Sequence, residues 1–161
     1  MSAIDWKTLL DAATEVAAKA YAPYSNYTVG AAAYADDGRV LVGCNIENSS
    51  LGLTLCGECG LISSLYATGG GRLTAFLCVH GDGELVTPCG RCRQLLLEHG
   101  GPDLPILSPQ GEVTLADLLP QHWLDYVPPE RATNPHPDSR NRHPGLVPGS
   151  PDEVRPGGEP T

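Results

Sequence analysis

Two cysteine pairs constrain this chain more than any other feature of its sequence. Cys56 and Cys59 stand three positions apart, Cys89 and Cys92 repeat that spacing, and 29 residues separate the two pairs. Each pair falls where a helix is expected to begin, so free backbone N–H groups and the helix dipole favour the thiolate, the form that binds zinc. Two such pairs therefore predict a zinc site.

Three interpretations of these cysteines compete. In the first, all four thiolates close a tetrahedral zinc site and the protein is a structural or binding module. In the second, three thiolates hold zinc and a water takes the fourth position, which makes the site catalytic. In the third, the weakest for two pairs at metal-binding distance, a pair acts as a redox dithiol. Helical geometry slightly favours the four-thiolate site, since residues three apart lie on nearly one face.

The residues beside the cysteines favour the catalytic site. Glu58 lies inside the first pair, and Pro88 immediately precedes the second. A carboxylate next to a ligand and a proline before the other pair fit the signature of zinc nucleobase deaminases, in which a glutamate that does not bind the metal carries protons. The other two cysteines, Cys44 and Cys78, fall in apolar segments and are interpreted as inert buried thiols.

Hydrophobic periodicity predicts an α/β fold. Helical patterns alternate with strand-like segments after an initial hairpin, whose turn is Asp36-Asp37-Gly38. This order favours a mixed sheet covered by helices. The expected helices are 5–21, 55–68, 88–99 and 114–119, and the expected strands are 27–35, 39–44, 73–79 and 104–107.

The composition of the chain changes near residue 128. Residues 130–161 contain seven prolines, four glycines and only four apolar side chains. Such a segment cannot bury enough surface to offset the entropy of ordering, so it is predicted to be a disordered tail. Residues 1–129 form the single predicted domain, a length that suffices for one compact core.

The net negative charge of the chain limits which partners it is expected to bind. It carries 10 Lys plus Arg against 19 Asp plus Glu, a net charge of −9. Nucleic acid is not an expected partner, because phosphate neutralisation needs clustered basic residues. An acidic chain is also unsuited to anionic membrane surfaces, and no run of 18 apolar residues predicts a membrane span. Since the N-terminus carries no apolar signal core, we expect a cytoplasmic protein.

Several sequence blocks resemble the small, homotetrameric, zinc-dependent cytidine deaminases, over residues 8–123. The resemblance implies a three-layer α/β/α fold with a five-stranded mixed sheet. It also implies hydrolytic deamination of cytidine and 2′-deoxycytidine to the uridines with release of ammonia, a reaction of pyrimidine salvage. The blocks are Ala22-Pro23-Tyr24-Ser25, Val29-Gly30-Ala31-Ala32, Gly43-Cys44-Asn45-Ile46-Glu47-Asn48, the pair formed by Cys56 and Glu58, and Pro88-Cys89-Gly90-Arg91-Cys92-Arg93-Gln94.

The resemblance also implies roles at the metal. Cys56, Cys89 and Cys92 would be the ligands of one zinc ion per chain. Glu58 would be the catalytic proton carrier, taking a proton from water and passing protons to the base and to the leaving ammonia. Water activated by zinc would attack the ring carbon that bears the amine.

Further roles concern the substrate. Asn45 and Glu47 would hydrogen-bond the ribose, although these residue types alone could equally cap a loop. Tyr27 stands where the family usually has Phe and would line the nucleoside pocket. The backbone of Gly57, where Ala is usual, would face the base. Trp123, in place of the usual Phe, would cover the base bound in a neighbouring subunit, so that a homotetramer would share its active sites.

One departure from the family concerns charge. The family usually has arginine at the position of Cys59, where it offsets the charge of the thiolates. With three thiolates and zinc formally at −1, we expect Arg93 and the two helix dipoles to compensate. Cys59 could be an inert thiol beside the site or a spare metal ligand, and the inert role is favoured because a fourth thiolate would remove the water position. Leu51 replaces a usual tyrosine and weakens one contact near the pocket.

Two other functions remain as alternatives. A deaminase of nucleoside antibiotics of the blasticidin S type shares the Cys-x-Glu and Pro-Cys-x-x-Cys blocks, but the block with Asn45 and Glu47, suited to a ribose, argues against it. The alternative from another class is the four-cysteine structural zinc module without activity.

Overall fold

A mixed β-sheet with helices on both faces organises residues 3–122, the part of the chain that this computed structural model describes. Five strands form a continuous path in the order β2-β1-β3-β5-β6, and β4 pairs with β3 beside that path. β3 and β5 are parallel, whereas the other pairs of neighbouring strands are antiparallel. The strands are β1 Val29–Ala35, β2 Val40–Cys44, β3 Leu73–His80, β4 Leu85–Val86, β5 Pro105–Ser108 and β6 Gly111–Thr114.

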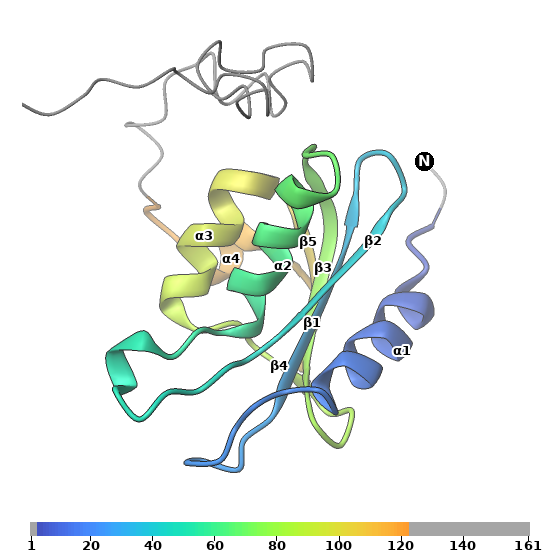
Figure 1. The fold of residues 1–161 in the computed structure, drawn as a ribbon. Coiled ribbons are helices and arrows are strands. Elements are labelled where there is room, and N and C mark those ends of the chain that lie inside the picture. The colour runs from blue at the N-terminus through green and yellow to red at the C-terminus, as the bar shows by residue number, and fades with distance from the viewer. Residues whose placement is uncertain (1–2, 123–161) are drawn as a thin grey trace, which may run out of the picture.

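The helices divide between the two faces of the sheet. α1 covers one face, while α2 and α3 lie side by side on the other (Figure 1). Successive residues of β1 point to opposite faces, so Ala32 packs with the α1 layer and Ala31 with the α2 and α3 layer. The expected three-layer fold is therefore confirmed. The helices are α1 Trp6–Ala17, α2 Gly57–Ala67, α3 Gly90–Gly100 and α4 Leu115–Leu118, and Leu51–Leu53 form a 3₁₀ turn, η1.

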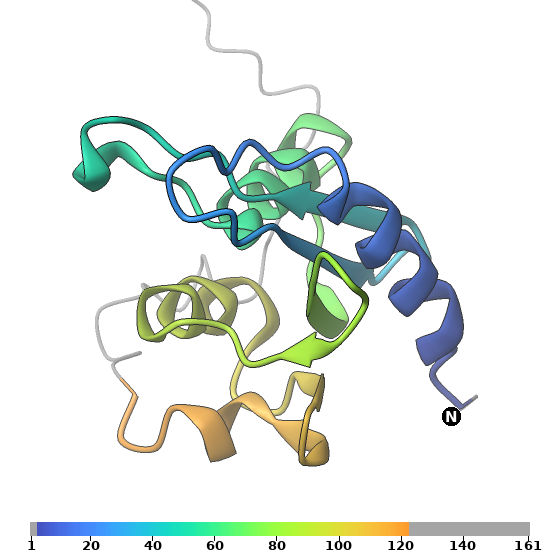
Figure 2. The same cartoon turned by 90° about the horizontal axis from the view of Figure 1, so that it is seen from below.

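The first helix is shorter than its sequence pattern predicts. Asp5 caps its start by accepting a hydrogen bond from the Thr8 N–H. The helix ends at Ala17 rather than at residue 21, because the backbone of Tyr21 pairs with the loop after β2 instead. The Tyr21 N–H donates to the Asn45 carbonyl at 3.1 Å, and the Glu47 N–H donates to the Tyr21 carbonyl at 2.8 Å. Tertiary pairing thus brings the loops before β1 and after β2 side by side (Figure 2).

Close backbone contact fixes the start of α2 on the sheet. A Cβ atom on Gly43 would lie 2.2 Å from the Gly57 carbonyl oxygen, and one on Gly57 would lie 3.0 Å from the Gly43 carbonyl oxygen. Only glycine at position 43 allows the two backbone segments to come this close. The contact places the residue that precedes α2, Cys56, directly beside the end of β2.

Two short strands escape prediction from sequence. β4 has two residues and β6 has four, and both depend on pairing with a neighbouring strand rather than on a pattern of their own. The predicted cap of the last helix is confirmed, since Thr114 and Asp117 form a capping box. Trp123 and the predicted tail 130–161 lie outside the described residues. Within residues 3–122, no helix is long and apolar enough to cross a membrane.

Candidate active site

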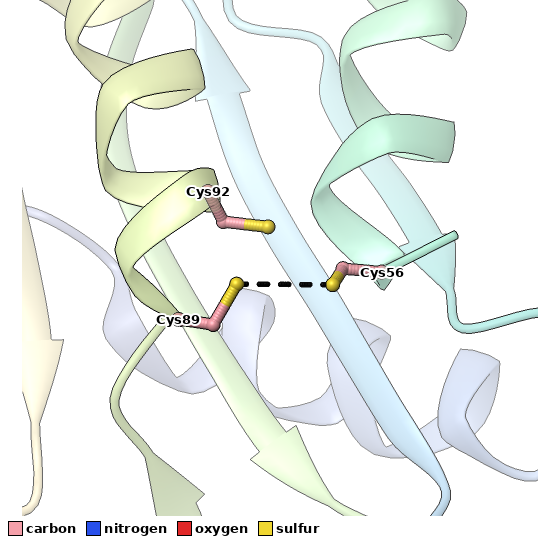
Figure 3. A group of neighbouring side chains, drawn as sticks. All are labelled: Cys56, Cys89 and Cys92. Atoms are coloured by element: carbon pink, nitrogen blue, oxygen red, sulfur yellow. Dashed lines mark hydrogen bonds between the residues drawn. The ribbon is translucent and has the colours of Figure 1, made fainter. Parts of the chain in front are cut away.

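The two cysteine pairs meet at the N-termini of α2 and α3. Cys56 is the N-cap residue of α2, Cys89 is the N-cap residue of α3, and Cys92 lies in the first turn of α3. Their three Sγ atoms lie within 4.8 Å of one another, and the sulfurs of Cys56 and Cys89 are 3.8 Å apart. Figure 3 shows the three side chains pointing from the two helices into one shared space. Cys59 does not belong to this group.

The surroundings of these thiols suit a metal ion. At Cys89, burial opposes ionisation, but hydrogen bonds from the backbone and thiol of Cys92 and from the thiol of Cys56 outweigh it and lower the pKa. Burial raises the pKa of Cys56 and of Cys92, and the negative charge of Glu58 adds to the increase at Cys92. Three thiolates at this spacing repel one another unless a cation lies between them. Zn²⁺, which binds thiolates tetrahedrally, fits this donor set.

Glu58 lies beside the cysteine cluster in the first turn of α2, where the helix dipole stabilises a carboxylate. Its residue surface is only 3% exposed. Glutamate is rarely buried to this degree without an ion-pair partner, yet none of the salt bridges among the described residues involves Glu58. The Glu58 carboxyl group contacts the Cys92 thiol, so a group able to transfer protons lies next to the clustered sulfurs.

A cavity of about 380 Å³ connects the cysteine cluster to the loops before β1 and after β2. This volume lies in the range of pockets for small molecules. Cys56, Glu58 and Cys89 line it from the starts of α2 and α3, and Tyr27, Asn45 and Glu47 line it from the two loops. Gly57 is buried and lines the same cavity. The structure thus brings together every predicted site residue that it describes.

Asn45 holds the start of β1 as well as lining the cavity. Its side-chain oxygen accepts from the Val29 N–H at 2.8 Å, and its Nδ2 donates to the Tyr27 carbonyl at 2.9 Å. Only 9% of the residue is exposed. One N–H of the amide and one lone pair of its oxygen remain for a ligand. Loop capping and ligand binding, the two roles left open by the sequence, are therefore compatible at this residue.

Glu47 is held by the loop that precedes β1. Its Oε2 accepts from the backbone N–H groups of Tyr24, at 2.8 Å, and Ser25, at 3.2 Å, and the Ser25 hydroxyl donates to Oε1. The Ser25 hydroxyl and these backbone groups lower the pKa of Glu47, so the carboxylate is charged at neutral pH. Tyr27 is half-exposed at the cavity, with its ring centroid 4.5 Å from that of His80.

The expected role of Arg93 in offsetting the thiolate charge is not supported by its contacts. Its Nε donates to the Pro88 carbonyl at 2.9 Å and its Nη1 to the Leu118 carbonyl at 2.8 Å, so it ties α3 to α4. Arg91 faces the sulfurs instead: its Nη2 lies 3.5 Å from the Cys59 sulfur and 3.8 Å from that of Cys56. Residues two apart on a helix point in different directions. The signal that could have identified Arg91 is a basic residue in a first helical turn.

The buried thiol of Cys78 also lines the cavity. Its Sγ donates to the Val86 carbonyl at 3.2 Å, which pairs it across β3 and β4. Burial raises the pKa of Cys78, with a further contribution from the charge of Glu58. It is therefore a neutral wall residue, in keeping with the inert role predicted for it.

Comparison with known proteins gives consistent matches. The sequence profile of the family described as the cytidine and deoxycytidylate deaminase zinc-binding region matches residues 4–108. The cytidine deaminase of Mycobacterium tuberculosis is 56% identical over 132 residues, covering 81% of this chain and 99% of that protein. The cytidine deaminase of Halalkalibacterium halodurans is 38% identical over 122 residues, covering 73% of this chain and 92% of that protein.

Solved structures give the same result. The crystal structure of the M. tuberculosis cytidine deaminase has a TM-score of 0.74 at 56% identity and covers 75% of this chain and 98% of its own. That of the Mycobacterium leprae cytidine deaminase has a TM-score of 0.73 at 58% identity and covers 74% of this chain and 100% of its own.

Proposed function

The chain belongs to the family of cytidine and deoxycytidylate deaminases, and from that premise we propose that it catalyses the zinc-dependent hydrolysis of cytidine and 2′-deoxycytidine. The products are uridine or 2′-deoxyuridine and ammonia. The observation that carries the proposal is a cluster of three thiols, two of which line one cavity together with a buried glutamate and a second set of polar side chains. That arrangement provides one end for the base and another for the sugar.

Each side chain has a defined task in this reaction. Cys56, Cys89 and Cys92 hold the zinc ion, which when bound supplies a Lewis acid that activates water at neutral pH. Glu58 takes a proton from the attacking water and delivers it to the ring nitrogen of the base. It then carries a proton to the leaving ammonia. One carboxylate suffices because the transfers are sequential and occur within reach of the same oxygen atoms.

The other end of the cavity binds and orients the nucleoside. Asn45 and Glu47 hydrogen-bond the ribose, while Tyr27 and the backbone of Gly57 line the space around the base. Binding energy from the sugar, remote from the reacting atoms, is used to position the base against the zinc and Glu58. Since Glu47 is charged and already held by the loop, its carboxylate is oriented before substrate arrives.

A homotetramer with shared active sites is part of the proposal. Beside the cavity, the single chain exposes a group of apolar side chains in and around η1, a surface that suits burial against another subunit. Trp123 of a neighbouring subunit would cover the base. The group comprises Ile46, Leu51, Leu53 and Leu55, with Leu51 76% and Leu53 65% exposed.

The proposal also covers the location of the enzyme, its metabolic role and its domain boundaries. We propose that the enzyme is cytoplasmic and acts in pyrimidine salvage, with residues 1–129 as the catalytic domain and 130–161 as a dispensable tail.

The homotetramer is tested by its mass and by Trp123. Light scattering during size-exclusion chromatography is expected to give the mass of four chains. Trp123→Ala is expected to raise the KM for cytidine more than it lowers the Tm.

The function is tested by following the loss of cytidine absorbance in the ultraviolet with a sample of known zinc content. Deamination of cytidine and 2′-deoxycytidine by a preparation with one zinc per chain is expected. Blasticidin S, assayed in parallel, is expected to be a poor substrate. Zinc-replete protein that leaves both nucleosides unchanged would contradict the proposal.

A further inference from the structure

Arg91 reaches the cysteine cluster from α3 through an exposed side chain. It is the second residue of that helix, and its Nη2 atom lies near three acceptors on the other side of the site. The nearest are the Cys59 sulfur and the Thr54 carbonyl oxygen, each at 3.5 Å, followed by the Cys56 sulfur at 3.8 Å. One guanidinium nitrogen therefore bridges the chain before α2, the N-cap of α2 and its first turn.

The position of Arg91 is unfavourable unless something negative lies nearby. The N-terminus of a helix carries a partial positive charge, so a cation in the first turn destabilises it. The first turn of α3 contains no acidic residue, and Arg91 takes part in none of the ion pairs between described residues. Its guanidinium instead faces two sulfurs and one carbonyl oxygen, and the Cys56 sulfur among them is anionic when it binds zinc.

The neighbouring arginine does not fill this role. Arg93 donates to the Pro88 and Leu118 carbonyls, and the ion pairs of Lys7, Lys19 and Arg39 lie elsewhere on the fold. Cys59 sits outside the group of three sulfurs, yet it contacts the same guanidinium nitrogen as Cys56. Its sulfur therefore serves as an acceptor for Arg91.

We propose that Arg91 is a positioning residue that offsets the thiolate charge of the zinc site, and that Cys59 holds its guanidinium against Cys56. The inference rests on the proposed zinc-dependent function. In this role Cys59 is not a spare metal ligand, because its sulfur accepts a hydrogen bond from the Arg91 guanidinium. It also explains how this chain retains three anionic ligands with a cation supplied from α3.

The test compares the zinc affinity of purified variants by competition with a chromophoric chelator. Arg91→Ala and Arg91→Gln are each expected to bind zinc about tenfold more weakly, the lower end of the effect of removing a partner of a metal ligand, since Arg91 is exposed to solvent. Gln retains hydrogen-bond donors but not the charge. Lys7→Ala, which removes an exposed cation on α1, is the matched control and is expected to leave zinc affinity unchanged.

Relocating the cation provides the rescue. Arg91→Ala combined with Cys59→Arg places a guanidinium on α2, three positions after Cys56. Zinc affinity is expected to return to within about threefold of the native value, since the same kind of partner is restored. The Tm of each zinc-loaded variant monitors folding. Undiminished zinc affinity in Arg91→Gln would overturn the charge role while leaving the proposed function intact. A native protein that binds no zinc would overturn both.

Discussion

Two groups of side chains line the cavity, and we name them the zinc end and the ribose end after the ligands proposed for them. They differ in how their polar groups are held. At the zinc end, Cys56 and Cys89 are the N-cap residues of two helices, and the neighbouring Glu58 is buried. At the ribose end, Asn45 and Glu47 belong to a loop and are held by hydrogen bonds from the chain before β1 and the start of β1. The first end is fixed by helices packed on a sheet, and the second by one loop against another.

This difference indicates what each end contributes. The zinc end owes its geometry to close backbone packing at Gly43 and Gly57, so its side chains have little freedom to rearrange. At the ribose end, the side chains that shape the loops are the ones proposed to bind the ligand. We therefore expect substitutions at the zinc end to abolish chemistry, and substitutions at the ribose end to act on substrate binding and loop stability together.

The largest effect is expected from removing a ligand. Cys92 is fully buried. Cys92→Ala should bind no zinc, have no activity and unfold at a substantially lower Tm, because thiolate ligation contributes to folding. Zinc content by mass spectrometry and thermal unfolding measure the change. Cys44→Ala, which deletes a thiol outside the cluster, is the control and should keep its zinc. Full zinc occupancy in Cys92→Ala would break the assignment of the zinc end.

The next effect separates chemistry from metal binding at the same end. Glu58→Gln should retain one zinc per chain and lower kcat by about 10²–10⁴, the range of general acid–base catalysis. The side chain keeps its size but can no longer accept and release the proton. Glu98→Gln, at an exposed site on α3, serves as the control. Turnover near the native rate in Glu58→Gln would remove this residue from the mechanism.

At the ribose end, Glu47→Ala should raise the KM for cytidine by about 10- to 100-fold, the equivalent of losing one hydrogen bond to a charged group, with zinc content unchanged. Ser25→Ala removes one loop contact of Glu47 while leaving the carboxylate in place. If both variants raise KM equally, Glu47 acts only by holding the loop, and its direct role in binding ribose is wrong.

The smallest effect is expected at Cys59, which lies near the zinc end without belonging to the metal cluster. Cys59→Ala should retain zinc stoichiometry and most of its activity, because a catalytic site needs an open coordination position. The Arg91 contact that it loses is one of three, so a loss of zinc affinity smaller than that in Arg91→Ala is expected. Loss of the metal on this substitution would make Cys59 a ligand.

The zinc end was more predictable from sequence than the ribose end. Spacing and helix signals identified Cys56 and Cys89 as helix starts, because thiolates, N-caps and periodicity all agree there. The roles of Asn45 and Glu47 came from the family resemblance alone, since contacts between loop residues 22 or 23 positions apart leave no local pattern. The direction of Arg91 required the orientation of α3, which a motif does not supply, and the short strand β4 has too few residues for any periodicity.

The coordination of the metal tests the central claim most directly. X-ray absorption at the zinc edge of the native protein, combined with metal analysis and the cytidine assay on the same sample, reports the number of sulfur ligands beside the activity. We expect one zinc per chain with three sulfur ligands and one lighter ligand, in a sample that deaminates cytidine. Four sulfur ligands in a sample without deaminase activity would contradict it and make the site structural.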